Sequence, residues 1–478
     1  KLIKRTKQLG KDSIIYGVGS VLSRSMNLIA LPIFTRLFSP GEYAFIDMVS
    51  VINVLLCSVI NLGFDLGQGV YFFEEKKKGI SAQKELVASI FRIRVIWGIV
   101  VVIFCTLCFP VFNSLFFDNR LPWQYLVLAF TGSLFMQISG QCADLFQLLF
   151  RPWLSSIITI FQACGSMAIA ICVVLIFDVG VFGVIVGTLI GSIGSAIFGW
   201  WMARDYFDLS SFNTDWWSRI SHFGLPTIPL ALAGWLIMNL DRIMIMNLLG
   251  PEAMGRYVVG VKIALILALV IGAVKLAWFP IALDVIQTEA GKKLLRNAST
   301  VYLGIGFTAA IIVSFIAPFV MQIIATPLYF KGHLVVGILC LFFVLEGYLG
   351  ISQLGLLKNK KTYLLTIFAV ISVIVSFIVI YLLIQIAGIL GAAIGMLVGV
   401  ILRNILSQII SETYYHVNFM SRIIFQQFFL ALVTIVNLII FGSNTYSFLF
   451  SLLSISLILV QTYQNSEVFR RALKMPER

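Results

Sequence analysis

About fourteen apolar stretches, each roughly 20 residues long, are separated by polar or helix-breaking residues along this chain. Inside a bilayer such a stretch must satisfy its own backbone hydrogen bonds, which favours a helix. The composition agrees, because 60% of the residues are hydrophobic and 12% are charged, whereas about 25% are charged in a typical soluble domain. The sequence therefore predicts an all-α polytopic membrane protein, with spans over 13–35, 43–64, 93–113, 122–145, 154–177, 180–203, 223–248, 256–280, 299–324, 334–357, 362–383, 386–410, 420–441 and 445–463.

The basic residues indicate how these spans are oriented. If the N-terminus is placed in the cytoplasm and the spans alternate, most of the 34 Lys and Arg residues fall in cytoplasmic segments. The outer segments then hold only Arg36, Arg120, Arg256 and Lys331. An excess of Lys and Arg on the cytoplasmic side is usual in membrane proteins, so both termini are predicted to be cytoplasmic. The net charge of +13 then reflects loops that attract anionic membrane lipids, and no nucleic-acid partner is expected.

Four basic side chains, those of Arg24, Arg242, Lys262 and Lys275, lie within predicted spans. A cation at the centre of a bilayer costs about 3 kcal/mol even on lenient scales, so these groups are expected to face water, an anion or an acidic partner. Lys262 and Lys275 lie near enough to span ends for their ammonium groups to reach the interface, and Arg242 can pair with the adjacent Asp241. Arg24 lies near the midplane and is the best-placed candidate for an anion-binding group.

Polar residues recur every three or four positions along several spans, which places them on one helix face. Gln137 and Gln141 belong to the clearest stripe, Gln162 belongs to a stripe in the following span, and Asn27 shares a face with Arg24. Such a face either lines a hydrated cavity or makes hydrogen bonds between helices. Where Gln, Asp or Arg recurs over several turns, we favour the cavity.

The chain contains two related loop segments. Leu37–Tyr43 joins the first two spans and Leu248–Glu252 joins the seventh and eighth, each with two apolar residues, a small residue and then Pro. Six spans, an even number, separate the copies, which implies a parallel repeat with a central site between its halves. We expect an N-terminal lobe over 1–205, a C-terminal lobe over 206–415, and two further spans with a cytoplasmic tail over 416–478.

Three motifs carry a resemblance to a known family. The segments Asp12–Gly17 and Leu31–Tyr43 resemble the opening of polysaccharide transporters, and Asp241–Ile245 resembles the start of that family's second half. These are Wzx-type flippases of O-antigen and other lipid-linked oligosaccharides, within the MOP superfamily. The resemblance implies two pseudo-symmetric six-helix lobes around a central cavity, two additional C-terminal helices, and transport by alternating access.

The resemblance also implies a substrate, an undecaprenyl-diphosphate-linked oligosaccharide used to build lipopolysaccharide, capsule or a similar polysaccharide at the bacterial cytoplasmic (inner) membrane. Other polysaccharide-assembly proteins are then expected partners. Basic side chains would bind the diphosphate, and polar stripes would solvate the sugars. The expected substrate-binding residues are Arg24, Asn27, Arg242, Lys262 and Lys275, and the expected cavity-lining residues are Gln137, Gln141 and Gln162. Coupling to a proton or sodium gradient would use a carboxylate, for which the candidates are Asp65, Asp144, Asp241 and Glu346.

Other classes fit the chain less well. A multidrug or small-molecule antiporter of the same superfamily would favour an acidic cavity for cationic drugs, whereas cations dominate the deep positions here. A membrane glycan polymerase needs outward catalytic segments, and the outer connections predicted here are short. Cys105 and Cys108 have metal-ligand spacing without a second pair, so neither a metal site nor another cofactor is expected, and no catalytic residue is assigned.

Overall fold

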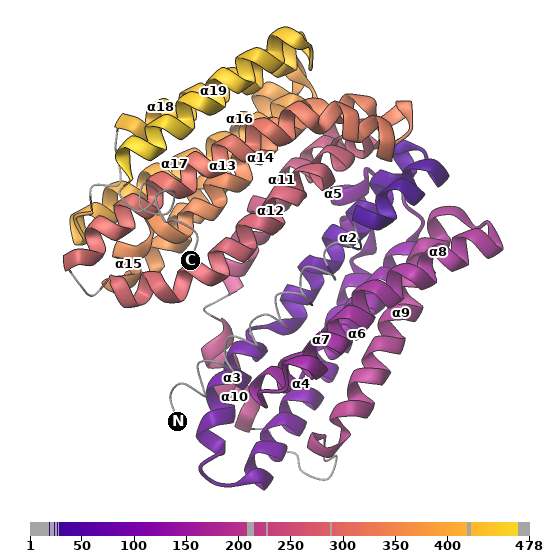
Figure 1. The fold of residues 1–478 in the computed structure, drawn as a ribbon. Coiled ribbons are helices and arrows are strands. Elements are labelled where there is room, and N and C mark those ends of the chain that lie inside the picture. The colour runs from indigo at the N-terminus through magenta and orange to yellow at the C-terminus, as the bar shows by residue number, and fades with distance from the viewer. Residues whose placement is uncertain are drawn as a thin grey trace, which may run out of the picture. The chain divides into compact units, whose positions relative to one another are not determined.

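A computed structural model of the chain describes residues 19, 23, 26, 28–207, 215–225, 228–286, 289–417 and 422–466. In this part of the chain every regular element is a helix (Figure 1). Of these, 13 helices are long and apolar enough to cross a membrane, and Leu28–Leu37 is a shorter apolar helix. The predicted all-α polytopic class is confirmed, and the number of spans agrees closely with the sequence. The earlier part of the first predicted span lies outside the described residues.

The chain divides into two compact units, unit 1 (Lys1–Trp235) and unit 2 (Leu236–Arg478). The boundary falls inside helix α11 (Ile228–Leu248). The sequence predicted a lobe boundary at residue 205 and set the last two spans apart at residue 415. Both boundaries remain predictions, because a division into compact units does not test a repeat in the sequence.

Unit 1 is a bundle of the earlier helices. Its elements are α2 (Pro40–Asn61), α3 (Phe64–Glu75), α4 (Ile80–Leu107), α5 (Phe109–Phe117), α6 (Trp123–Leu148), α7 (Pro152–Ile160), the π-helical turn η1 (Phe161–Gly165), α8 (Ser166–Phe177), α9 (Gly180–Ala203), the short η2 (Arg204–Tyr206) and α10 (Asp215–Gly224). In this unit α6 packs against α2, α4, α7 and α9. It is therefore the central helix of the bundle.

The turn between α2 and α3 explains why the predicted second span ends where it does. Leu62 and Gly63 adopt left-handed backbone conformations with φ of 49° and 75°, which stops α2, and α3 then starts at once. A Cβ on Gly63 would lie 2.5 Å from the Cα of Gly224 in α10. Glycine is therefore required here both for the backbone angle and for the close approach of α10.

The expected span 93–113 was wrong at its start. Helix α4 begins at Ile80, and its first turns bury Leu86, Val87 and Ile90 in a core shared with α3 and α10. A hydropathy average misses these turns because only one face of them is apolar. Residues assigned to a cytoplasmic loop therefore belong to packed helix.

Small residues allow α8 and α9 to pack closely. Gly183, Gly187 and Gly191 recur every four residues on α9, and a Cβ on Gly187 would lie only 2.3 Å from the Cα of Ala170. Repeated small residues at this spacing let the backbones of membrane helices approach each other.

We expect Gly187→Ala to destabilise unit 1 by about 1–3 kcal/mol, because the added methyl group must push α8 away from α9. Gly140→Ala on α6 is the matched control, since a Cβ there would meet no atom within 4 Å. Thermal unfolding of the purified variants in detergent compares the two. Equal midpoints for the two variants would contradict close packing of α8 on α9.

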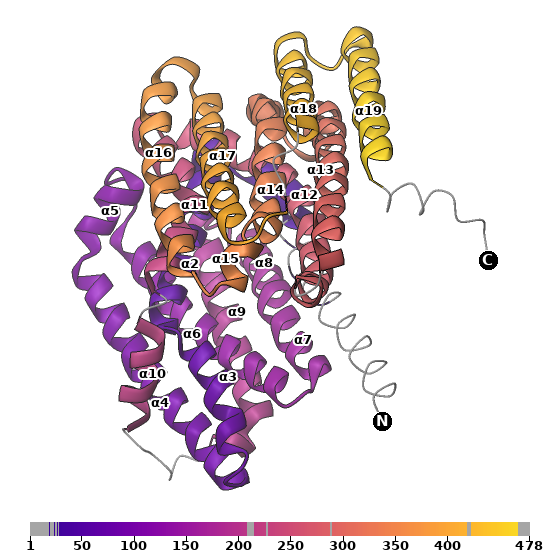
Figure 2. The same ribbon diagram turned by 90° about the vertical axis from the view of Figure 1, so that its left-hand side faces the viewer.

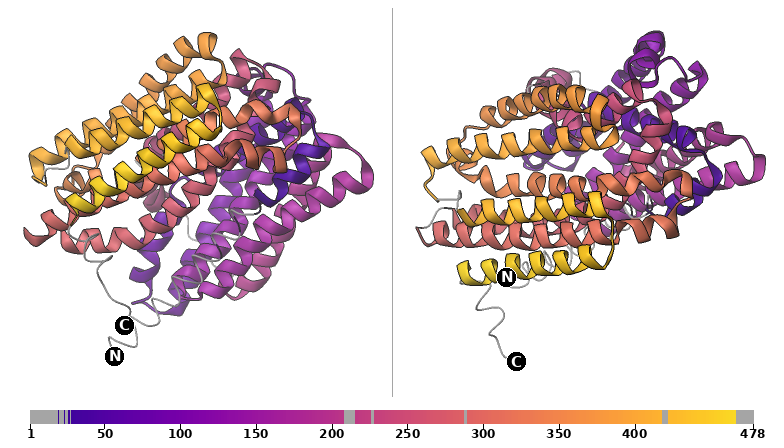
Figure 3. Two further views of the ribbon diagram at one scale, coloured as in Figure 1. Left: turned by 45° about the horizontal axis from the view of Figure 1, so that its top comes forward. Right: turned by 90° about the horizontal axis from the view of Figure 1, so that it is seen from above.

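Unit 2 contains the later helices. They are the rest of α11, α12 (Pro251–Val285), α13 (Glu289–Ile324), the short η4 (Pro327–Gly332), α14 (His333–Ser352), α15 (Leu354–Lys358), α16 (Tyr363–Ala387), α17 (Ile389–Tyr414), α18 (Arg422–Phe441) and α19 (Thr445–Asn465). Helix α14 packs against α12, α13 and α17, and α16 runs beside α17 (Figure 2). The last two helices, α18 and α19, pack on α13 (Figure 3), as expected for additions at the edge of a bundle.

Candidate functional site

Unit 1 contains a buried group of charged side chains on α3, α4 and α6. Arg94 is fully buried, and its Nη2 donates to Oδ1 of Asp65 over 2.6 Å. Asp144 on α6 interacts electrostatically with both Asp65 and Arg94. We call Asp65, Arg94 and Asp144 the charged cluster.

Two amides extend the charged cluster. Nε2 of Gln141 donates to Oε1 of Gln68 over 3.1 Å, and both side chains are buried. Within the described residues, Oε1 of Gln141 and both Nε and Nη1 of Arg94 have no hydrogen-bond partner. Buried donors and acceptors of this kind are usually satisfied by ordered water, so this region suits a small hydrated site.

Arg94 is the candidate site residue that sequence reasoning missed. It was counted among the cytoplasmic cations because the third span was expected to start at residue 93, whereas Asp65 and Asp144 were both selected as carboxylates. The available signal was its position between Ile93 and Val95 in a run that is otherwise apolar. Residues on that face of a helix are buried, and a buried arginine needs an acidic partner.

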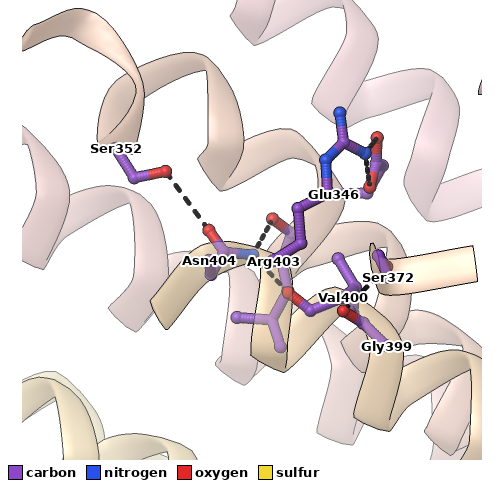
Figure 4. Close-up of polar contacts among 8 residues, drawn as sticks. Glu346, Ser352, Ser372, Gly399, Val400, Arg403 and Asn404 are labelled. Carbon is purple, nitrogen blue, oxygen red and sulfur yellow. Dashed lines mark hydrogen bonds and ion pairs between the residues drawn. The ribbon is translucent and has the colours of Figure 1, made fainter. Parts of the chain in front are cut away.

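Unit 2 contains a second ion pair, between Glu346 on α14 and Arg403 on α17. Nη1 of Arg403 lies 3.1 Å and 3.3 Å from the two carboxylate oxygens (Figure 4). The neighbouring Asn404 donates to the carbonyl of Leu345 over 3.0 Å and accepts from Ser352 over 3.3 Å. The predicted coupling carboxylate Glu346 is therefore paired within unit 2 with Arg403 of α17.

The predicted carboxylate Asp241 joins α11 to α12. It accepts hydrogen bonds from the hydroxyl of the buried Tyr257 and from the backbone N–H of Arg242, while Nη1 of Arg242 donates to Asn239 over 3.3 Å. Asp241 is itself buried. These contacts give Asp241 a positioning role between the two helices, and its role in coupling remains a prediction.

The structure does not bring the two predicted lysines of α12 together. Lys262 and Lys275 lie about 20 Å apart along the helix at 1.5 Å per residue, and they point to nearly opposite sides. Lys275 is exposed, and its Cε lies 3.3 Å from where a Cβ of Gly350 would be, so its aliphatic chain rests on α14 one turn beyond Glu346. One diphosphate could not contact both lysines at once.

The remaining predicted residues fall in three places. Arg24 and Asn27 lie outside the described residues. Gln137 is buried on α6, and Gln162 lies in the π-helical turn, where it donates to Ser192 over 3.1 Å. The hydrogen bonds of Gln141 and Gln162 connect helices, and a role for these amides in lining a cavity stays a prediction. Among the described residues, no three His, Cys, Asp or Glu side chains are grouped so that they could hold a metal ion.

Comparison with known families assigns the chain. A model of the family described as "Polysaccharide biosynthesis protein" matches residues 9–286, which is more than half of the sequence. The chain belongs to this family. The predicted resemblance, which rested on motifs from both ends of the matched range, is confirmed. No curated protein sequence matches the chain.

Solved structures resemble the chain along most of its length. The "Lipid II flippase MurJ, inward closed conformation" superimposes with a TM-score of 0.73 at 12% identity, over 97% of this chain and 100% of that one. An inward-facing multidrug resistance MATE family transporter of the MOP superfamily follows with a TM-score of 0.65 at 16% identity, over 84% and 97%. The outward-facing form gives 0.59 at 14%, over 85% and 95%. This family member therefore has the fold of MOP superfamily transporters.

Proposed function

We propose that the chain is a flippase, and not an enzyme, that moves an undecaprenyl-diphosphate-linked oligosaccharide from the cytoplasmic to the outer leaflet of a bacterial inner membrane. The observation that carries this proposal is membership in a polysaccharide biosynthesis family together with a multi-pass fold that matches a lipid II flippase over its whole length. The MATE transporters match a smaller share of the chain.

The basic side chains support an anionic cargo. Arg242 and Lys262 are partly buried, and Lys275 is exposed on the same unit. Guanidinium and ammonium groups bind phosphate oxygens through short charge-assisted hydrogen bonds. Because Lys262 and Lys275 are far apart along α12, we propose that they contact the diphosphate at different stages of transport, with Arg24 and Asn27 completing the site.

We also propose that transport is coupled to protons through the charged cluster of unit 1. A guanidinium beside both carboxyls disfavours a sodium ion at the same place because the two cations repel each other. One proton on either carboxyl would instead leave the cluster neutral.

Reconstitution tests the flippase proposal. Purified protein in liposomes is expected to expose an inner-leaflet, fluorescently labelled undecaprenyl-diphosphate oligosaccharide to an external quencher. In flippase-deficient cells that make a defined lipid-linked glycan, expression of the protein is expected to restore glycan export. Protein without the labelled lipid and empty liposomes are the controls. Efflux of cationic dyes by the same vesicles, with no movement of any lipid-linked glycan, would identify the multidrug antiporter instead.

A further inference from the structure

Two arginines at one end of unit 1 lie over tryptophan rings. The guanidinium of Arg204, which directly follows α9, is 5.9 Å from the ring centroid of Trp201. On α10, the guanidinium of Arg219 is 5.2 Å from the ring centroid of Trp216. A cation is attracted to the negative face of an indole ring, so each ring helps to hold its arginine in place.

A third arginine has a tryptophan close by in the sequence. Arg151 directly precedes α7, and Trp153 is the second residue of that helix. The neighbouring side chains Leu154 of α7, Met202 of α9 and Trp216 of α10 all pack in one hydrophobic core of unit 1. The three arginines therefore lie at the same end of the unit, which the sequence predicts to be cytoplasmic.

The charges of these arginines are not neutralised by neighbouring side chains. Arg151, Arg204 and Arg219 are exposed, and within the described part of the chain none of them forms an ion pair. Asp205 and Asp215 belong to the same segments but are not paired with them. We call the three arginines the arginine surface. Guanidinium groups of this kind suit an anionic partner with oxygen acceptors.

Exposed indole rings indicate that this partner is a lipid. Trp153 is 64% exposed and Trp201 is 57% exposed. They lie at the ends of the candidate membrane spans Pro152–Phe177 and Gly180–Tyr206. On α10, Trp217 is 40% exposed beside the arginine surface. Tryptophans at the ends of spans sit among the lipid headgroups of a bilayer, where phosphate groups are within reach of the arginines.

We propose that the arginine surface binds the headgroups of anionic phospholipids, with the guanidinium groups on the phosphates and the neighbouring indole rings in the headgroup layer. A guanidinium binds phosphate oxygens through two parallel hydrogen bonds. Bound lipid would also anchor α10, which leads into α11, at the membrane surface. This inference concerns unit 1 alone and does not depend on which cargo is transported.

Native mass spectrometry of the purified full chain measures how tightly lipids remain bound. Phosphatidylglycerol, which is anionic, and phosphatidylcholine, which has no net charge, are added separately at equal concentrations, and the dissociation constant of each is obtained. We expect phosphatidylglycerol to bind more tightly. Arg151→Gln, Arg204→Gln and Arg219→Gln are each expected to weaken its binding about fivefold, the usual contribution of one basic side chain near an anionic lipid surface.

The lysines Lys76, Lys77 and Lys78 provide the matched control. They are exposed after α3 in the same unit, and in the described part of the chain no cation–π contact joins them to a ring. Replacing all three by Gln removes the same charge as replacing the whole arginine surface by Gln. We expect the triple lysine variant to keep the preference for phosphatidylglycerol and the triple arginine variant to lose it.

Equal dissociation constants of the two lipids for the unmodified protein would overturn the proposal. An equal loss of preference in the two triple variants would also overturn it, because general charge and not the arginine surface would then attract the lipid. A preference that survives in the triple arginine variant would overturn it as well, and would leave an acidic protein as the partner of these residues.

Thermal unfolding of each variant in detergent without added lipid checks that it folds, which is expected because the substituted side chains are exposed. If a triple variant fails to fold, the three single arginine variants carry the test, and unchanged binding of phosphatidylglycerol in all three would overturn the proposal. Because the assay contains no lipid-linked glycan, its result is separate from the success or failure of the flippase proposal.

Discussion

Arg94→Met is expected to destabilise unit 1 by about 3–5 kcal/mol, the usual cost of removing one partner from a buried ion pair. The arginine side chain is fully buried, and the substitution leaves two carboxyls with no cation beside them. Since the side chain of Asp65 is 33% exposed, some of its solvation persists, and we expect the lower end of that range. Thermal unfolding in detergent measures the loss.

A double-mutant cycle identifies the cause. Asp65→Asn in the Arg94→Met background is expected to restore much of the lost stability, because it removes the carboxylate that lost its arginine partner. The control is Arg120→Met, whose partner Asp118 and own side chain are both about half exposed, and which should cost no more than about 1 kcal/mol. If Arg94→Met and Arg120→Met unfold alike, Arg94 is not paired in a buried site.

Arg24→Ala is expected to lower the rate of glycan export about 100-fold while leaving folding and membrane insertion intact. Two charge-assisted hydrogen bonds from one guanidinium to a diphosphate contribute about 1.5–3 kcal/mol each, and the lower limit of their sum, about 3 kcal/mol, corresponds to a change of roughly a hundredfold. Arg24→Lys keeps the charge but not the planar fork, so it should fall between Arg24→Ala and the unmodified protein. Quencher access to labelled lipid in liposomes measures the rate.

Arg36→Ala is the matched control for Arg24→Ala. Arg36 is exposed in the helix Leu28–Leu37, and it directly follows the predicted span 13–35 that contains Arg24. Its replacement is expected to leave export unchanged. Export at the normal rate in Arg24→Ala would remove Arg24 from the proposed diphosphate site, whatever the result at the other basic residues.

The spans and the family could be predicted because their signals are local. A window of apolar residues marks a membrane helix wherever it occurs, and the loop Leu37–Tyr43 carries its capping chemistry in its own residues. Ser39 and Glu42 form a reciprocal cap at the start of α2. The start of α4 was missed because its first turns are apolar on one face alone. A hydropathy average over a window of residues does not detect such a face.

The charged groups could be selected from the sequence but not paired. Asp65 and Asp144 were both chosen as carboxylates, yet nothing in their spacing shows that they meet. Glu346 was likewise chosen as a carboxylate, and its partner Arg403 across α14 and α17 appears only in the structure. Which face of a helix meets which neighbour depends on the packing of the whole unit.

The sequence by itself determined that this chain is an all-helical membrane protein of a polysaccharide biosynthesis family, because hydrophobic length and local motifs need no knowledge of distant residues. The tertiary structure alone decided that Arg94 is the cation of the charged cluster and that α10 packs on α3. The physical reason is that the energy of a buried charge depends on the groups that lie within a few ångströms of it. For Arg94 those groups include Asp65 and Phe64, which α3 supplies.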